Sequence, residues 1–420
     1  MKKYLALLLV LVMVLSLAAC ASKPAETTDE PEQTTPVPAP AEETKDEEPA
    51  PAEETKEEEP TEEPADNTEY AVAMITDYGD ITDQSFNQTT YEACKAFCED
   101  NGVEFSYFKP AGDNTADRVA MIEKAVDEGY NVIVMPGYAF GGAIVEAAPE
   151  FPDVKFIALD VAKGDLLEAG VAKAGESYDY NPDNWDLEKY VDMSNVYCAI
   201  YQEELCGYMA GYAAVKLGYE KLGFLGGMAV PAVIRYGYGW LQGARDAAKE
   251  LGVEVECNYT YAGQFNPDAS ITAKMEGWYT NGTEIVFACG GGIYASAVEA
   301  ANIHGAKVVG VDVDQSYIDA CIVTSAMKGL QNVTETILAD LEAGKWESTY
   351  GGKFITYSLA EGDYVGIPTA ESSWRFNNFT MEQYEAVHAK LMSGEIVVDN
   401  SSDDATKPTV SEFTNVTYIQ

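Results

Sequence analysis

The stretch "YAVAMITDYGDITDQSFNQTTYEACKAF", residues 70–97, decides the fold because its polar loop joins a strand pattern to a helix pattern. Residues 70–76 are an apolar run of strand length, and helical periodicity begins near residue 87. The loop between them places three aspartates, a serine and an asparagine around Phe86. A turn needs few polar groups, whereas a binding site needs flat apolar surface together with hydrogen-bonding groups. The loop therefore predicts one wall of a binding site.

The alternation of short apolar runs and amphipathic stretches continues along the chain and predicts βαβ units on parallel sheets. A polar, aromatic and irregular stretch at residues 163–195 interrupts it, which we interpret as an insertion or a long surface loop. The expected strands of the first series lie at residues 70–76, 104–110, 131–137 and 154–160. Those of the second series lie at residues 221–227, 254–263, 284–292 and 307–314.

Two such series with a break between them predict an α/β protein with two doubly wound lobes. Ligands of such sheets bind outside the carboxyl ends of the strands. Polar and glycine-rich motifs follow the expected strands at those ends, at residues 76–87, 136–142, 226–235, 290–292 and 312–315. We therefore expect these motifs to meet in one ligand cleft.

The first twenty residues have the three parts of a secretory signal peptide. Two lysines precede an apolar run at residues 4–17, which is short for a membrane span, and "LAAC" ends at Cys20. A cysteine directly after small residues resembles a bacterial lipobox, which predicts cleavage and lipidation of Cys20. A plain signal peptide with an incidental cysteine is the alternative.

Residues 21–69 are rich in Pro, Glu and Thr and contain the near repeats "APAEETKDEEP" and "APAEETKEEEP". They carry 18 acidic residues against three lysines and almost no apolar side chains. Such a segment buries too little to offset its ordering entropy, so we predict a disordered, self-repelling tether. An acidic interaction arm is the competing interpretation.

The composition of the chain excludes several classes of function. A formal net charge of −44 argues against nucleic acid as a partner. The chain has only two histidines and no C-x-x-C pair, so we expect neither a zinc site nor a cofactor held by such ligands. Besides Cys20, seven cysteines remain, an odd number that favours buried thiols over a disulfide framework.

Four motifs occur in the order of a known family. "ITDYGDITDQSFNQ", "FLGGMAVPAVIRYGYGWLQGA", "FACGGG" and "VGVDVDQ" with "TSAMKG" after it resemble the basic membrane protein family of substrate-binding lipoproteins. These proteins serve ABC importers and include purine nucleoside receptors. The resemblance, from about residue 70 to about 400, implies a type I periplasmic-binding-protein fold with crossing connections between two lobes. The expected lobes and tail are residues 70–197 plus about 314–345, residues 198–313 plus about 346–400, and residues 401–420.

The resemblance implies a nucleoside whose base stacks on Phe86, with Asn87 beside it and Asp77 at the base edge. For the opposite aromatic wall we choose Tyr294, in the loop after "FACGGG", and then Tyr236. A planar phenylalanine ring suits a heteroaromatic base, since base stacking is worth about 1–3 kcal/mol. The alternatives are a core phenylalanine at a helix start and an aspartate that caps the helix.

The resemblance also implies that Asp312 and Lys328 hold the ribose hydroxyls. A carboxylate and an ammonium group form an acceptor and donor pair for vicinal hydroxyls, although a structural ion pair between the lobes is the alternative. Gly290 is included because a glycine lets the backbone approach a ligand closely, although glycines after strands also simply make turns.

We therefore expect a monomeric substrate-binding protein, lipid-anchored on the extracytoplasmic face of the cell membrane, that delivers a nucleoside to an ABC permease and its ATPase. A sensor or receptor of the same fold for a sugar or another aromatic metabolite is the alternative. A nucleoside hydrolase would need paired carboxylates, for which Asp77, Asp80 and Asp83 are the candidates. No nucleophile–base motif accompanies them, so we expect no enzyme.

Overall fold

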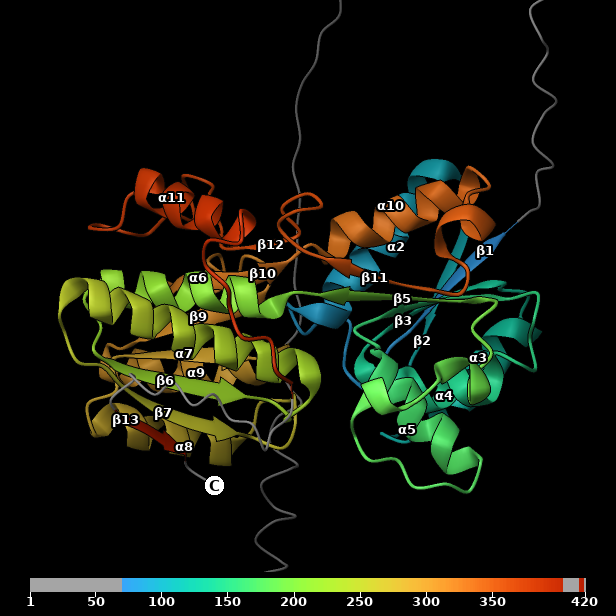
Figure 1. Cartoon of the computed structure of the whole chain (residues 1–420), viewed down its shortest axis with the longest axis horizontal. Coiled ribbons are helices and arrows are strands. Elements are labelled where there is room, and N and C mark those ends of the chain that lie inside the picture. The colour runs from blue at the N-terminus through green and yellow to red at the C-terminus, as the bar shows by residue number, and fades with distance from the viewer. Residues whose placement is uncertain (1–69, 403–414, 419–420) are drawn as a thin grey trace, which may run out of the picture. The chain divides into compact units, whose positions relative to one another are not determined.

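The computed structural model of the 420-residue chain describes residues 70–402 and 415–418. The expected signal peptide with Cys20, the expected tether and most of the expected C-terminal tail lie outside the described residues. The described residues belong to one compact unit. They form two largely parallel β-sheets with helices packed on them (Figure 1).

The first sheet has six strands in the order β11-β5-β4-β3-β1-β2, and all neighbouring strands are parallel. The four central strands are almost entirely buried, so apolar residues fill both of their faces, whereas the two edge strands are partly exposed. The strands are β1 (Ala71–Ile75), β2 (Glu104–Phe108), β3 (Val132–Pro136), β4 (Lys155–Leu159), β5 (Val196–Tyr201) and β11 (Lys353–Tyr357).

The second sheet has seven strands in the order β12-β10-β9-β8-β6-β7-β13, parallel except for the β10–β12 pair. The strands are β6 (Lys221–Gly226), β7 (Glu256–Tyr261), β8 (Ile285–Cys289), β9 (Lys307–Asp312), β10 (Ile322–Lys328), β12 (Val365–Gly366) and β13 (Asn415–Tyr418).

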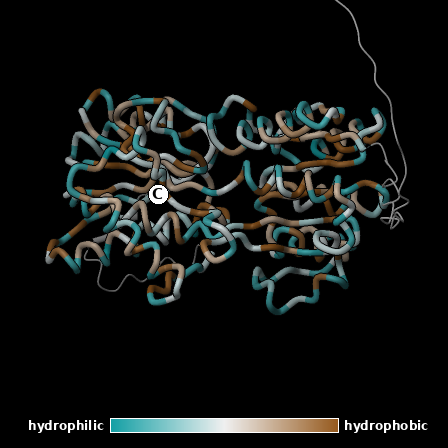
Figure 2. The backbone as a smooth tube through the Cα atoms, turned by 90° about the horizontal axis from the view of Figure 1, so that it is seen from above, coloured by the Kyte–Doolittle hydropathy of each residue, from teal (hydrophilic) through white to brown (hydrophobic). Residues whose placement is uncertain are grey.

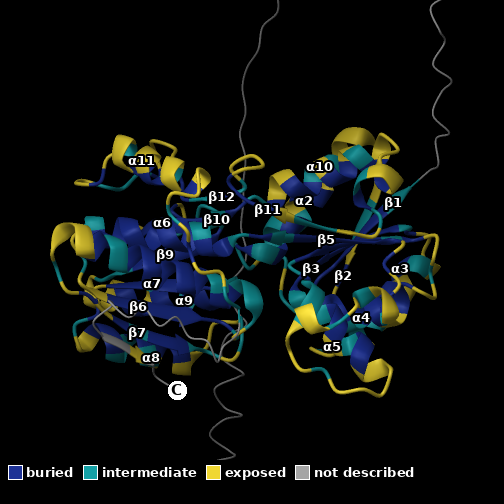
Figure 3. Ribbon diagram, viewed as in Figure 1, coloured by how far each residue is buried: buried dark blue, intermediate teal, exposed yellow. Residues whose placement is uncertain are grey.

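Helices cover both faces of each sheet. In β1, successive side chains point to opposite faces and pack against different helices. Val72 and Met74 join the apolar cluster that includes α2, whereas Ala73 and Ile75 join the cluster under α3, α4 and α5. Figure 3 shows the buried strands between helices whose outer faces are exposed. Figure 2 colours the backbone by hydropathy and shows hydrophobic stretches running through the interior. The helices are α2 (Phe86–Asn101), α3 (Thr115–Asp127), α4 (Gly141–Ala147), α5 (Lys163–Lys173), α6 (Glu203–Lys216), α7 (Pro231–Leu251), α8 (Ala269–Thr280), α9 (Tyr294–His304), α10 (Leu330–Glu342) and α11 (Met381–Met392).

Helices α6 and α7 pack unusually closely because glycines four residues apart face each other. A Cβ at Gly207 would lie 2.3 Å from the carbonyl oxygen of Tyr236, and one at Gly243 would lie 1.9 Å from that of Tyr208. The backbones approach where no side chain intervenes. This contact fixes the N-terminal turns of both helices, which carry Glu203 and Tyr236.

Strand pairing differs from the expected lobe boundaries. Residues 314–345 were expected with the first lobe, yet β10 within them pairs with β9 of the second sheet. Residues 346–400 were expected with the second lobe, yet β11 within them pairs with β5 of the first sheet. After β10 the chain passes from the second sheet to the first. There α10 packs on α2, and β11 follows it in the sequence. Such crossings depend on long-range pairing, which local sequence patterns do not report.

Two further expectations need correction. The stretch at 163–195 begins with helix α5, whose Leu166, Leu167 and Val171 are buried. Its carboxyl end then forms short turns up to β5, so only its second part is a surface loop. In the expected tail, residues 415–418 add β13 to the edge of the second sheet beside β7.

The seven cysteines among the described residues are buried free thiols, as expected. Over residues 70–402 and 415–418, no helix combines the length and the apolar character that a membrane crossing requires.

Candidate functional site

The loops after equivalent strands of the two sheets have the same local structure. Gly137 follows β3 and Gly290 follows β8, with φ of +124° and +132°, which only glycine adopts readily. Asp160 follows β4 and Asp312 ends β9, with φ of +62° and +66°. These conformations turn the backbone sharply at the carboxyl ends of the strands. The loops that follow these strands in both sheets line one cavity.

The cavity has a volume of about 300 Å³ and is lined by residues from the loops of both sheets. This volume lies at the small end of the range for ligand pockets, roughly 300–1,000 Å³. All eight positions that the sequence predicts for ligand binding line it, namely Asp77, Phe86, Asn87, Tyr236, Gly290, Tyr294, Asp312 and Lys328.

Phe86 is the first residue of α2 and presents a half-buried ring to the cavity. The helix start is capped by Asp83, whose carboxylate accepts hydrogen bonds from the backbone N–H groups of Ser85 (2.9 Å), Asn87 (3.0 Å) and Gln88 (3.0 Å). Asp83 thus does the capping that was the alternative role of Asp77. Burial raises the pKa of Asp83 to about 6, although the same hydrogen bonds oppose the shift.

Asp77 is buried and keeps one carboxylate oxygen for the cavity. Its Oδ1 accepts hydrogen bonds from the backbone N–H groups of Tyr78 (2.7 Å) and Gly79 (2.8 Å). Its Oδ2 accepts none from any residue of the described chain. Arg118 Nε donates to the Asp77 carbonyl oxygen at 3.0 Å and holds the loop in place. Burial raises the pKa of Asp77, against the effect of these hydrogen bonds and of Arg118.

Asn87 also offers the cavity an unused polar atom. Its Nδ2 donates to Asp83 at 3.2 Å, which sets the orientation of the amide. Its Oδ1 is buried and has no hydrogen-bond partner among residues 70–402 and 415–418. A buried acceptor without a partner is costly, so a ligand donor at this position would be favourable. Phe86, Asp77 and Asn87 together therefore offer a ring face with acceptors beside it.

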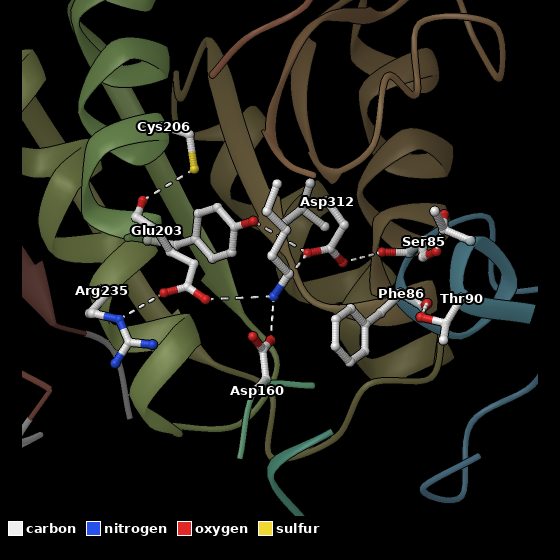
Figure 4. A network of polar contacts seen from close by, with 12 residues as sticks. Ser85, Phe86, Thr90, Asp160, Glu203, Cys206, Arg235 and Asp312 are labelled. Atoms are coloured by element: carbon white, nitrogen blue, oxygen red, sulfur yellow. Dashed lines mark hydrogen bonds and ion pairs between the residues drawn. The ribbon is translucent and has the colours of Figure 1, made fainter. Parts of the chain in front are cut away.

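Lys328 is the centre of a buried charge network. Figure 4 labels the other members of the network, Asp160, Glu203, Arg235 and Asp312. Its ammonium group pairs with Asp160 and lies 3.6 Å from Asp312 Oδ1 and 3.7 Å from Glu203 Oε1. It also lies 4.5 Å from the centroid of the Phe86 ring. Burial alone would lower the pKa of Lys328, but the three carboxylates raise it, so the side chain is charged at neutral pH.

The network holds more carboxylates than cations. Arg235 Nε lies 2.7 Å from Glu203 Oε2 and 4.0 Å from Glu204 Oε2, which brings a second cation and a fourth carboxylate. Burial raises the pKa of Asp160 to about 6 and that of Glu204 to about 7. Asp312 and Lys328 are therefore a buried ion pair between the loops as well as candidate ligand contacts. The two interpretations from sequence are compatible.

The two tyrosines expected on the second aromatic wall are both more buried than another aromatic residue that lines the cavity. Tyr236 is buried, packs edge-on against Phe287 and donates to Asp312 Oδ1 at 3.3 Å. Tyr294, the first residue of α9, is also buried. Phe265, in the loop after β7, lines the cavity and is only half-buried, so it presents more ring surface than either tyrosine.

Sequence reasoning missed Phe265 and Asp160. The signal for Asp160 was present, because "ALD" ends a strand as "GVD" does at Asp312. Phe265 lies in a loop without a strand or helix pattern, so only its place in the fold reveals it. Tyr138 also lines the cavity and was not predicted.

The carboxylates considered for a hydrolase do not form a catalytic pair. Asp80 is exposed and pairs with Lys109 at 3.0 Å, while Asp83 is engaged by the start of α2. Within the described part of the chain, no group of histidine, cysteine and carboxylate side chains has the arrangement of a metal site.

Two α/β units that contribute loops to one cavity have the architecture of the type I periplasmic-binding-protein fold. Solved structures with this fold resemble the chain. An ABC-transporter solute-binding protein from Aeropyrum pernix K1 has a TM-score of 0.64 at 21% identity, over 82% of this chain and 96% of that one. One from Conexibacter woesei has a TM-score of 0.58 at 22% identity, over 79% and 99%.

Residues 70–402 match the model of the Bmp family, described as ABC transporter substrate-binding protein PnrA-like, and the chain belongs to this family. A curated relative is the ABC transporter nucleoside-binding protein BmpA of Lactococcus lactis subsp. cremoris, 26% identical, over 73% of this chain and 84% of the relative. Another is basic membrane protein A of Borreliella burgdorferi, 26% identical over 80% and 89%. The chain is thus an ABC-transporter substrate-binding protein and not an enzyme, as the sequence predicted.

Proposed function

We propose that this protein captures a purine nucleoside in the cavity and delivers it to an ABC permease and its ATPase. The observation that carries the proposal is the division of the cavity into two parts. Phe86, Asp77 and Asn87 supply a ring face and hydrogen-bond acceptors, which suit the face and edge of a base. Asp312, Asp160 and Lys328 supply charged acceptors and a donor, which suit sugar hydroxyls.

The charge of the cavity supports a neutral ligand. Its lining includes five aspartates, Asp77, Asp80, Asp83, Asp160 and Asp312, and Lys328 is the one lysine or arginine among the lining residues. An anionic group would meet repulsion that this single cation does not offset, since Lys328 is already paired with carboxylates. A nucleoside carries no charge at neutral pH, and its hydroxyl and amino groups donate hydrogen bonds to carboxylates.

Phe265 is the better candidate than Tyr294 or Tyr236 for the second aromatic wall, because its ring is the least buried of the three. We propose that the base lies between Phe86 and Phe265. The relative from Lactococcus lactis is named a nucleoside-binding protein, which supports the same class of ligand for this chain.

We further propose that the mature protein is a monomer anchored at the extracytoplasmic face of the membrane through lipidated Cys20. The acidic segment at residues 21–69 would then be the tether that separates the binding unit from the membrane. Both features rest on the sequence, since they lie outside the described residues.

Mass spectrometry of ligand released from the purified and denatured protein tests the ligand class. A nucleoside in the extract, and calorimetric binding of adenosine, guanosine or inosine by the ligand-free protein, is the expected result. A sugar or another aromatic metabolite in the extract, with no nucleoside binding, would favour a receptor for that compound instead.

A further inference from the structure

Two consecutive residues directly before Phe86 are held by the loop after β9, which belongs to the second sheet. Ser85 Oγ donates to Asp312 Oδ2 at 2.5 Å, as Figure 4 shows. Gln315 Nε2 donates to the carbonyl oxygen of Gln84 at 2.9 Å. Ser85 and Gln315 are completely buried. The loop that leads into Phe86, the proposed stacking residue, is therefore hydrogen-bonded to Asp312, the proposed sugar contact, and to the loop that follows it.

Gln84 has a strained backbone conformation that these hydrogen bonds hold in place. Gln84 has a φ of +52°, in the left-handed region that residues with a Cβ rarely adopt. Its N–H donates to Gln88 Oε1 at 2.9 Å, and its carbonyl oxygen accepts from Gln315. Strained backbone persists where surrounding contacts hold it. The turn that places the Phe86 ring relative to Asp312 thus depends on a contact from the other sheet.

The amide of Gln315 is itself oriented by its neighbours. Its Oε1 accepts from the backbone N–H of Val311 at 3.0 Å, and its own backbone N–H donates to Ser325 Oγ at 3.0 Å. If the amide were reversed, an NH₂ group would face the Val311 N–H, and the oxygen would face the Gln84 carbonyl. The position therefore requires an acceptor on one side and a donor on the other, which only an amide of this length supplies.

We propose that Gln315 is a positioning residue that couples base recognition to sugar recognition. Its amide joins the carbonyl oxygen of Gln84, two residues before Phe86, to the N–H of Val311, directly before Asp312. It thereby sets the separation between the Phe86 ring and the Asp312 carboxylate, so that one nucleoside reaches both. The inference rests on the proposed function, because it concerns how the same cavity reads a nucleoside. Gln315 itself is absent from the cavity lining and acts through its hydrogen bonds to Gln84 and Val311.

The test compares a nucleoside with its free base. The proposed contacts of a free base are Phe86, Asp77 and Asn87, which all lie in the loop after β1 and the start of α2. A nucleoside also contacts Asp312, which belongs to the other sheet. Gln315→Glu keeps the size and the acceptor and, in its ionised form, removes the donor. We expect adenosine affinity to fall about tenfold or more, since a buried hydrogen bond is lost. Adenine affinity should fall by less than about threefold.

Further variants separate the loss of the hydrogen bond from the effects of misfolding and of added charge. Gln315→Met removes both the donor and the strong acceptor without adding a charge, and it serves if Gln315→Glu does not fold or stays protonated. Gln331→Glu, an exposed glutamine on α10, is the control for the change in charge and should bind like the parent. In a Phe86→Ala background, Gln315→Glu should cost little further adenosine affinity, because without the ring no separation between ring and Asp312 remains to be set.

Several results would overturn the inference. Equal loss of adenosine and adenine would indicate general destabilisation, and so would an undiminished effect in the Phe86→Ala background. A folded Gln315 variant that binds adenosine like the parent would overturn the inference alone. A parent protein that binds no nucleoside would overturn the proposed function, and the inference with it.

Discussion

Asp160 and Lys328 form a buried ion pair that joins the carboxyl end of β4 in the first sheet to that of β10 in the second. The two residues are 168 positions apart in the chain. Lys328 also lies within 4 Å of Asp312 and Glu203, so one ammonium group faces three carboxylates. This arrangement makes both the stability and the ligand preference of the protein depend on buried charge.

The excess of buried carboxylates predicts that stability falls as the pH rises from about 4 to about 7. Burial raises the pKa of Asp160 to about 6 and that of Glu204 to about 7, above the ordinary values of 3.8 and 4.5. The unfolded chain therefore loses these protons first, and the stability they contribute is present below about pH 4 and lost as the pH passes the folded pKa. Thermal melting at a series of pH values measures this.

Asp160→Asn should flatten that decline between pH 4 and 6, because the amide does not titrate. Asp192→Asn is the matched control, since Asp192 is exposed and a hydrogen bond from the Ser194 N–H lowers its pKa. Its titration therefore falls below this pH window. Identical pH profiles for the parent and Asp160→Asn would show that Asp160 does not titrate there.

Phe86→Ala should weaken adenosine binding by roughly tenfold to over a hundredfold, which corresponds to about 1–3 kcal/mol of stacking. Titration calorimetry measures the change. Tyr91→Ala is the control on the same helix, because its ring packs against Phe105 and Tyr107 instead of the cavity. If the Phe86 variant folds and binds every nucleoside like the parent, the ring is core packing.

Asp312→Ala should weaken ribonucleosides far more than free bases, because its proposed partners are sugar hydroxyls. Hydrogen bonds to a charged group contribute about 1.5–3 kcal/mol, or roughly tenfold to over a hundredfold in affinity. The substitution also removes contacts to Ser85, Tyr236 and Lys328, so the melting temperature should fall. Calorimetry with adenosine and adenine separates the two effects, and an equal loss for both ligands contradicts the assignment.

Gly290→Ala should lower ligand affinity by displacing the Phe265 ring. A Cβ at this position would lie 2.6 Å from Phe265 Cδ1, at a φ that disfavours any side chain. Gly252→Ala is the control, since Gly252 also has a positive φ but has no heavy atom within 4 Å of the added carbon. We expect the control to lose only stability, about 1 kcal/mol. Unchanged nucleoside affinity in a folded Gly290→Ala protein would remove Phe265 from the binding wall.

Cys20→Ser should release the protein from the membrane fraction, because the lipobox-like "LAAC" then offers no thiol for lipidation. Fractionation of cells that express the parent and the variant, followed by detergent extraction, measures the distribution. The binding unit of the released protein should keep the nucleoside affinity of the parent. Retention of the variant in the membrane fraction would indicate another anchor.

Much of the fold could be predicted because its signals are local. Each of the eight expected strands overlaps a strand of the structure, and the helix expected from about residue 87 is α2. Helix α5 was missed because its apolar residues lie within a stretch rich in glycine and charge. The placement of β10 and β11 was wrong because a strand's partner is chosen by distant residues.

The sequence by itself determined the class of fold, the family and the motifs that line the cavity, because apolar periodicity and polar loops after strands are properties of neighbouring residues. It pointed to Phe86 and Asp77 through the polar loop after the first strand, and to Lys328 through the resemblance to the family. Only the tertiary structure decided that Lys328 pairs with Asp160 and that Phe265 joins the wall. Those contacts unite loops far apart in the chain, and they exist only after strand pairing has brought the two sheets to one cavity.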